Sequence, residues 1–93
     1  MEITHTNEGT INKNSVSIRT EHGTLNLYFS YETLIGVNGK VSVNNWSNTT
    51  GKFLNELEPD KKKRIEHDEI LLIAEKELRN LFLTTPEQIQ QNL

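Results

Sequence analysis

The feature that most constrains this chain is a period-two alternation of apolar and polar residues between Ser15 and Tyr31. The apolar members of the run are Val16, Ile18, Leu25, Leu27, Phe29 and Tyr31. A repeat of two is typical of a half-buried β-strand, and the break at His22-Gly23 predicts a two-residue hairpin loop. The predicted pairs are Thr20 with Leu25, Ile18 with Leu27 and Val16 with Phe29. In this register every apolar residue lies on one face of the hairpin.

A second hairpin is predicted at Asn38-Gly39, because these residues tolerate the positive φ angles of a tight turn. It joins strands at 33–37 and 40–44. We expect one face of this hairpin to meet the core through Leu34, Val41 and Val43. The other face carries Ile35 and Val37, and it is either half covered or available to a partner. The amino-terminal segment with Ile3 and Ile11 is a candidate edge strand.

After Trp46 the spacing of apolar residues becomes helical. A short helix is predicted over 49–57, entered through residues 47–50 and ended by Pro59. A charged connector follows at 61–64, which we interpret as a solvated linker. A longer helix is predicted over 68–83 with Asp68 as its N-cap.

The longer helix is predicted to be amphipathic. Its core side carries Ile70, Ile73, Ala74, Leu78 and Leu81, widened by Leu71 and Phe82. Leu72 and Leu83 lie opposite, either as stray exposed leucines or as a dimer or partner surface. The sequence at 85–88 reads as a capping box that opens a short terminal helix.

These elements predict a single α+β domain over residues 1–93. Its architecture is an antiparallel sheet of four to five strands, with one long helix on one face and a short helix at the border. Residues 1–45 are mostly β, 46–83 mostly α, and 84–93 form a short terminal helix or tail.

Composition narrows the function classes. The chain has no cysteine, a net charge of −3 and three histidines without metal-ligand spacing. We therefore expect no metal site, no cofactor and no nucleic acid as the main partner. We identify no nucleophile motif and no distinctive carboxylate pair, so we expect a binding protein rather than an enzyme. The start of the sequence has no secretory pattern and no stretch of membrane-spanning length, which favours the cytoplasm.

One local feature has binding chemistry. Residues 46–52 place hydroxyls, a lysine and backbone N–H groups at a helix start, which suits an anion. The candidate ligand contacts are Trp46, Ser47, Thr49, Thr50 and Lys52. The competing and favoured interpretation is that Ser47 or Thr49 caps the helix while Trp46 packs into the core. Ile35, Val37 and Leu72 are the candidate contacts to a protein.

The stretches Leu27–Gly36, Asn45–Asn55 and Arg64–Glu69 resemble a family of small uncharacterised domains from phages and mobile elements. The likeness covers about residues 25–82 and leaves out the amino-terminal strands. It implies a phage accessory protein that binds and inhibits a host defence component in the host cytoplasm, such as a CRISPR effector, so that the protein would be an anti-CRISPR protein. Two alternatives stay open. The first is a small anionic-ligand or nucleic-acid module that uses the helix start, and the second is a structural homo-oligomer, for instance a homodimer.

Overall fold

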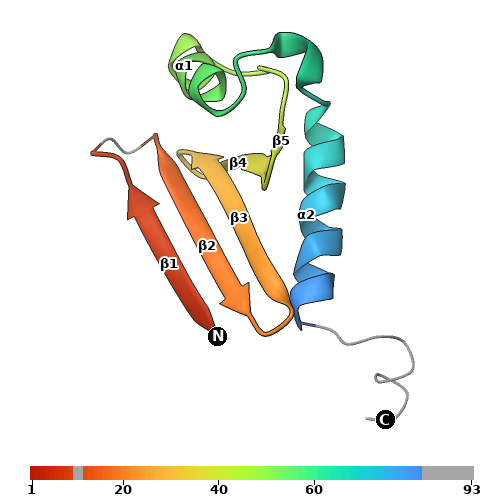
Figure 1. Ribbon diagram of the computed structural model, residues 1–93. Coiled ribbons are helices and arrows are strands. Elements are labelled where there is room, and N and C mark those ends of the chain that lie inside the picture. The colour runs from red at the N-terminus through yellow and green to blue at the C-terminus, as the bar shows by residue number, and fades with distance from the viewer. Residues whose placement is uncertain (10–11, 83–93) are drawn as a thin grey trace.

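The computed structural model describes residues 1–9 and 12–82, and in these residues five strands form an antiparallel sheet that two α-helices follow (Figure 1). The strands are β1 (Glu2–Asn7), β2 (Asn14–Thr20), β3 (Gly23–Ser30), β4 (Thr33–Val37) and β5 (Lys40–Val41). The helices are α1 (Asn48–Leu57) and α2 (His67–Phe82), with a 3₁₀ turn at Lys61–Lys63 between them. The α+β class is confirmed, and Ile3 lies in the expected edge strand. Ile11, Leu83 and the predicted terminal segment at 84–93 lie outside the described residues.

The sheet is a meander in which each strand pairs with the next along the chain. In the first long hairpin, Thr20 pairs with Gly23 and Ile18 with Leu25, so the loop is Glu21-His22 and the predicted register is wrong by two residues. Gly23 is the first residue of β3 and does not belong to the loop. Its φ of 144° is a conformation that favours glycine. The predicted faces of the two strands are nevertheless correct. Side chains of a strand alternate between its faces with a repeat of two, so a shift of two residues leaves each side chain on the same face.

The Asn38-Gly39 hairpin is confirmed, with Val37 opposite Lys40 and Asn38 at a φ of 52°. Strand β5 ends at Val41, earlier than predicted, because the chain then turns to a different neighbour. The Val43 N–H donates to the Ile65 carbonyl at 2.8 Å, and the Ile65 N–H donates to the Val41 carbonyl at 2.9 Å. The segment before α2 is thereby attached to the end of the sheet.

An irregularity between β3 and β4 decides where the apolar side chains of β4 point. Leu27 pairs with Val37, but Phe29 pairs with Leu34, so Ile35 is an extra residue without a partner on β3. Leu34 and Val37 therefore pack on the α2 side, while Ile35 packs on the α1 side. Ile35 and Val37 are both 0% exposed. The prediction that they share one face, either half covered or available to a partner, is wrong.

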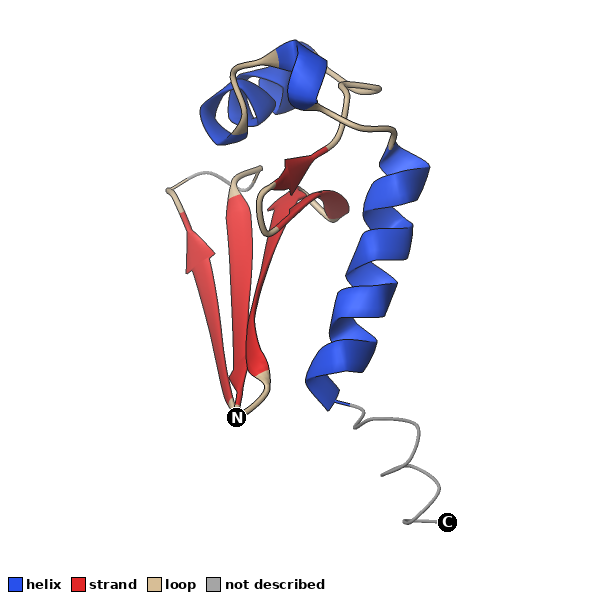
Figure 2. Ribbon diagram, turned by 45° about the vertical axis from the view of Figure 1, so that its right-hand side comes forward, coloured by secondary structure: helices blue, strands red, loops and turns tan. Residues whose placement is uncertain are grey.

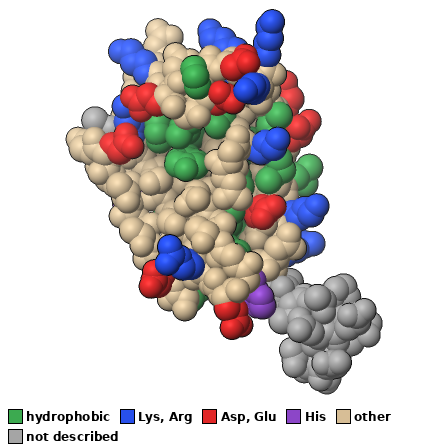
Figure 3. Space-filling model, viewed as in Figure 1, with side chains coloured by type: hydrophobic (Ala, Val, Ile, Leu, Met, Phe, Trp, Pro, Cys, Tyr) green, Lys and Arg blue, Asp and Glu red, His purple; other side chains and the backbone are tan. Residues whose placement is uncertain are grey.

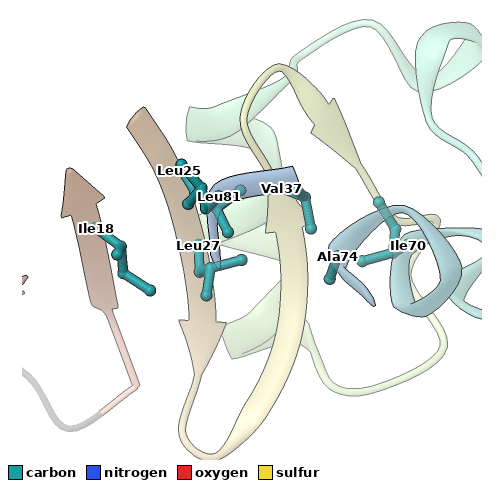
Figure 4. Close-up of a cluster of buried hydrophobic side chains, with 7 residues drawn as sticks. All are labelled: Ile18, Leu25, Leu27, Val37, Ile70, Ala74 and Leu81. Atoms are coloured by element: carbon teal, nitrogen blue, oxygen red, sulfur yellow. The ribbon is translucent and has the colours of Figure 1, made fainter. Parts of the chain in front are cut away.

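Helix α2 packs across one face of the sheet, over β3 and β4, as a second layer (Figure 2). The buried cluster between the layers is drawn in Figure 4 and consists of Ile18, Leu25, Leu27, Val37, Ile70, Ala74 and Leu81. Ile73 and Leu78 pack against it as predicted. Leu71 and Phe82 do not pack against this cluster and are 45% and 50% exposed. The strands beneath α2 cover a narrower stripe of the helix than predicted. Helix α2 starts at His67, so Asp68 lies in its first turn rather than at its N-cap.

Helix α1 lies at the border of the sheet, beyond the ends of β2 and β3 (Figure 1), and packs on the side that carries Ile35. Its buried cluster consists of Ile35, Val41, Phe53 and Leu54, with Tyr28 and Leu57 packed against it. The Ser30 and Thr50 hydroxyls meet at 2.8 Å beside this cluster, and both residues are buried. Within the described part of the chain, neither helix has the length and apolar character needed to cross a bilayer.

Candidate functional site

Ser47 is the N-cap of α1, one of the two residues that the capping interpretation proposed, and Thr49 is not. Its hydroxyl oxygen accepts a hydrogen bond from the Thr50 N–H at 3.3 Å, and its carbonyl accepts one from the Gly51 N–H at 2.9 Å. The Thr50 hydroxyl is directed to Ser30, so it is part of the interior. Ser47 and Thr50 therefore stabilise the fold, and their hydroxyls are already used by the chain itself.

Trp46 does not pack into the core, so that part of the capping interpretation is wrong. Its side chain is 37% exposed, and the edge of its ring meets the His67 ring at a centroid distance of 4.9 Å. The His67 Nε2 lies 2.9 Å from the Leu34 carbonyl, which fixes the imidazole against the sheet. Trp46 thus links the starts of α1 and α2 at the surface. Thr49 and Leu72 are exposed on the two helices.

A groove of about 720 Å³ runs along the polar side of α1. One wall is formed by Asn48, Gly51, Lys52 and Asn55 of α1, and the other by Val43, Asn44, Lys61 and Arg64. Of the binding residues predicted from the sequence, only Lys52 lines this groove. In the view of Figure 3, Lys and Arg side chains lie among Asp and Glu side chains at the end of the molecule that carries α1 and the 3₁₀ turn.

Gly51 allows the two walls to approach each other. A Cβ atom at this position would lie 2.8 Å from the Asn44 Nδ2. The Asn44 side chain is fixed by two hydrogen bonds, since its Nδ2 donates to the Ser47 carbonyl at 3.2 Å and its Oδ1 accepts from the Trp46 N–H at 2.9 Å. The wall opposite α1 is therefore held by the same turn that starts the helix.

Arg64 is the most unusual residue of the groove, because it is only 9% exposed and carries a charge. Its Nε and Nη2 donate to the Glu58 carbonyl at 3.0 and 2.9 Å, and Nη2 also donates to the Asn55 Oδ1 at 2.6 Å. No ion pair joins Arg64 to a described Asp or Glu, and Nη1 makes no hydrogen bond to a described residue. The interpretation of Arg64 as part of a solvated linker is wrong.

The bond from Arg64 also orients Asn55. Because the guanidinium can only donate, Asn55 must present its amide oxygen to it, and the Asn55 Nδ2 remains available as a donor. Lys52 and Lys61 add two exposed ammonium groups. The groove therefore has three cationic side chains and an amide donor, and no Asp or Glu is among the described residues that line it.

The carboxylates near this site in sequence are engaged elsewhere. Glu56 pairs with the Lys13 Nζ at 2.6 Å, and Asp60 caps the 3₁₀ turn by accepting from the Lys62 N–H at 3.0 Å. A Glu58 side-chain oxygen lies 3.4 Å from the Asp60 N–H, which donates to it. Among the described residues, none of these three carboxylates forms an ion pair with Lys52, Lys61 or Arg64.

The histidines remain apart in the structure. His5 is bonded to Asn14 on the edge strands, His22 lies in the β2–β3 loop, and His67 lies against Leu34. Among the described residues, no three His, Asp or Glu side chains gather as ligands for a metal ion.

Part of the groove could have been found from the sequence. Asn48, Gly51, Lys52 and Asn55 have the spacing of one helical face, opposite the apolar residues of α1. The second wall comes from segments on either side of α1, and neither its position nor the burial of Arg64 follows from a local pattern. The prediction at the helix start therefore identified the correct helix, but of the residues that it named only Lys52 lines the groove.

Comparison with known proteins gives one match. A family model described as a family of unknown function, DUF8033, matches residues 1–71. The match contains every groove residue and the amino-terminal strands, which the resemblance noted in the sequence had left out. Neither the curated proteins nor the solved structures include a match to this chain. Because the family model covers more than half of the sequence, the chain belongs to the DUF8033 family of unknown function.

Proposed function

We propose that this protein is a binding protein whose groove along α1 holds an anionic ligand. The observation that carries the proposal is Arg64, a residue that is 9% exposed and whose guanidinium is held by a neutral carbonyl and a neutral amide. A buried charge without a countercharge is costly, and an anion in the groove would supply that countercharge.

Arg64 also has a structural role, which uses different atoms. The Glu58 carbonyl that it binds lies at the C-cap of α1, where a cation interacts favourably with the helix dipole. That role uses Nε and Nη2 and leaves the two N–H groups of Nη1 unused among the described residues. Because every described buried side-chain N or O atom has a partner, Nη1 reaches solvent, and Arg64 borders the groove. Helix capping and ligand binding are therefore compatible.

The 3₁₀ turn offers a matched pair of variants for testing this proposal. Lys61 lines the groove, whereas Lys63, two residues later in the same turn, does not. Titration of ¹⁵N-labelled protein with inorganic phosphate should shift the amide signals of Asn48, Gly51 and Lys52. Lys61→Ala should weaken binding several-fold, Lys63→Ala should leave it nearly unchanged, and added salt should weaken it in both.

Equal losses in the two variants would indicate a diffuse positive surface instead of a site. Shifts spread over the whole molecule, or no shifts at all, would contradict the proposal. Lys40→Ala, in the β4–β5 hairpin and outside the groove lining, controls for the loss of one positive charge.

A second candidate function is inhibition of a host defence component, such as an anti-CRISPR activity, which the sequence resemblance implied. The feature that favours a protein partner is the apolar exposure of α2, where Leu71, Leu72 and Phe82 are 45%, 66% and 50% exposed. Affinity purification of tagged protein from cells with an active defence system should recover the effector. Leu72→Lys should abolish that recovery, and Lys76→Ala, on the same helix, should not. Recovery of no effector, with phage targeting unchanged, would exclude this candidate.

A further inference from the structure

We infer that the ligand of the groove is a small organic phosphate of about the size of a nucleoside monophosphate. This inference rests on the proposed function and deepens it. Three observations lead to it: which donors of Arg64 are left, how large the groove is, and where the neighbouring carboxylates lie.

The remaining donors of Arg64 favour a phosphoryl group over a carboxylate. A carboxylate is best bound by two parallel N–H groups from the guanidinium fork. Both forks of Arg64 need Nη2, and its donors are occupied by the Asn55 Oδ1 and the Glu58 carbonyl. Only Nη1 is left, so Arg64 offers a ligand one nitrogen instead of a fork.

A phosphoryl group accepts single donors from several directions, because its three terminal oxygens point to different sides. The groove offers such donors from separate segments: Nη1 of Arg64, Nδ2 of Asn55, and the ammonium groups of Lys52 and Lys61. They come from α1, from the 3₁₀ turn and from the segment before α2. This distribution matches the acceptor geometry of a phosphoryl group.

The groove has room for a molecule larger than inorganic phosphate. At about 30 Å³ per heavy atom, the value for liquid water, the five heavy atoms of phosphate take up about 150 Å³. The groove measures about 720 Å³, so most of it would remain for the rest of a larger molecule. Beside its cations, the groove is also lined by uncharged residues, among them Val43, Asn44, Asn48 and Gly51. The volume of the groove lies within the range of roughly 300–1,000 Å³ that is usual for pockets binding small organic molecules.

The surrounding charge argues against a nucleic-acid strand. The chain has a net charge of −3, and Glu56, Glu58 and Asp60 lie within a few residues of the groove lining. A polyanion extending past the groove would approach these carboxylates and be repelled. A small phosphate ester places its charge among the cations and does not extend to the carboxylates.

The test is isothermal titration calorimetry of the full chain. The probes are inorganic phosphate, citrate, adenosine, a single-stranded oligonucleotide and a panel of organic phosphates. The panel consists of nucleoside monophosphates and glucose 6-phosphate. We expect the tightest member of the organic phosphate panel to bind at least tenfold more tightly than inorganic phosphate, citrate or the oligonucleotide. Adenosine should not bind. Lys61→Ala should weaken binding of the organic phosphate at least fivefold, and Lys63→Ala should change it less than twofold.

The outcomes separate this inference from the proposed function. Equal binding of inorganic phosphate and every organic phosphate would overturn the inference while the groove remains an anion site. Tighter binding of citrate or of the oligonucleotide would do the same. If none of the anions binds, the inference and the proposed function are both wrong.

Discussion

The two helices pack against the sheet in different ways. Under α2 the buried residues are apolar, from Ile18 on β2 to Leu81 at the end of the helix. Under and beside α1 the apolar cluster is smaller, and the buried set also contains Ser30, Thr50 and Arg64. The α2 side is stabilised by removal of apolar surface from water, whereas the α1 side also needs hydrogen bonds that satisfy its buried polar groups. The candidate site lies on the α1 side, where polar groups are already fixed.

The largest expected effect lies in the α2 layer. Ile70 is 0% exposed and its neighbour Leu71 is 45% exposed. Ile70→Ala should lower the free energy of unfolding by about 2–5 kcal/mol, because it removes buried methyl groups and leaves a cavity. Leu71→Ala should change it by less than about 0.5 kcal/mol, as for most surface substitutions. Urea denaturation measures both, and equal losses would contradict the packing described for α2.

Arg64 should have the next largest effect, on the α1 side. Arg64→Met keeps the aliphatic stem but removes the donors to the Glu58 carbonyl and the Asn55 Oδ1. We expect a loss of about 2–3 kcal/mol, in the range for hydrogen bonds to a charged group. Arg64→Lys should restore part of the loss, since an ammonium group can reach fewer of these acceptors. An Arg64→Met variant as stable as the parent would mean that the guanidinium is not held by the Glu58 carbonyl and the Asn55 Oδ1. The ligand site would then not be preorganised.

The Ser30–Thr50 contact offers a sharper test of the polar interior. Thr50→Val keeps the shape of the side chain and leaves the buried Ser30 hydroxyl without its partner, at an expected cost of about 1–2 kcal/mol. Adding Ser30→Ala removes the unsatisfied hydroxyl, so the double variant should lose less than the sum of the two single changes. Additive losses in this double-mutant cycle would show that the 2.8 Å contact does not couple the two residues.

The smallest expected effect is at the start of α1. Ser47→Ala removes the N-cap acceptor and should cost about 1 kcal/mol. Thr49→Ala is the matched control, because Thr49 is exposed and is not the cap; its change should stay below about 0.5 kcal/mol. Thermal denaturation of the two variants compares them directly. A larger loss in Thr49→Ala would mean that the cap has been assigned to the wrong residue.

The missed hairpin turn between β3 and β4 shows a limit of sequence patterns. Ser30 pairs with Thr33, so the turn residues are Tyr31 and Glu32, and Tyr31 has a φ of 55°. This backbone conformation favours glycine or asparagine, and a tyrosine there gives no sign of a turn. The alternation therefore placed Tyr31 in a strand on the apolar face, whereas the structure exposes half of its side chain.

Patterns in the sequence predicted the α+β class, the Asn38-Gly39 turn, an N-cap at Ser47 or Thr49, the apolar faces of β2 and β3 and the central stripe of α2. These features depend on local periodicity and on residues with strong conformational preferences, which act over a few positions. Contacts between segments that are distant in the sequence set two further features. These are the opposite orientation of Ile35 and Val37, which requires a bulge against β3, and the burial of Arg64 beside Asn55. A charged run such as 61–64 looks the same in a sequence whether it is solvated or buried. Its environment depends on long-range pairing, here the attachment of Ile65 to the end of the sheet, which brings Arg64 to the end of α1 and forms the groove.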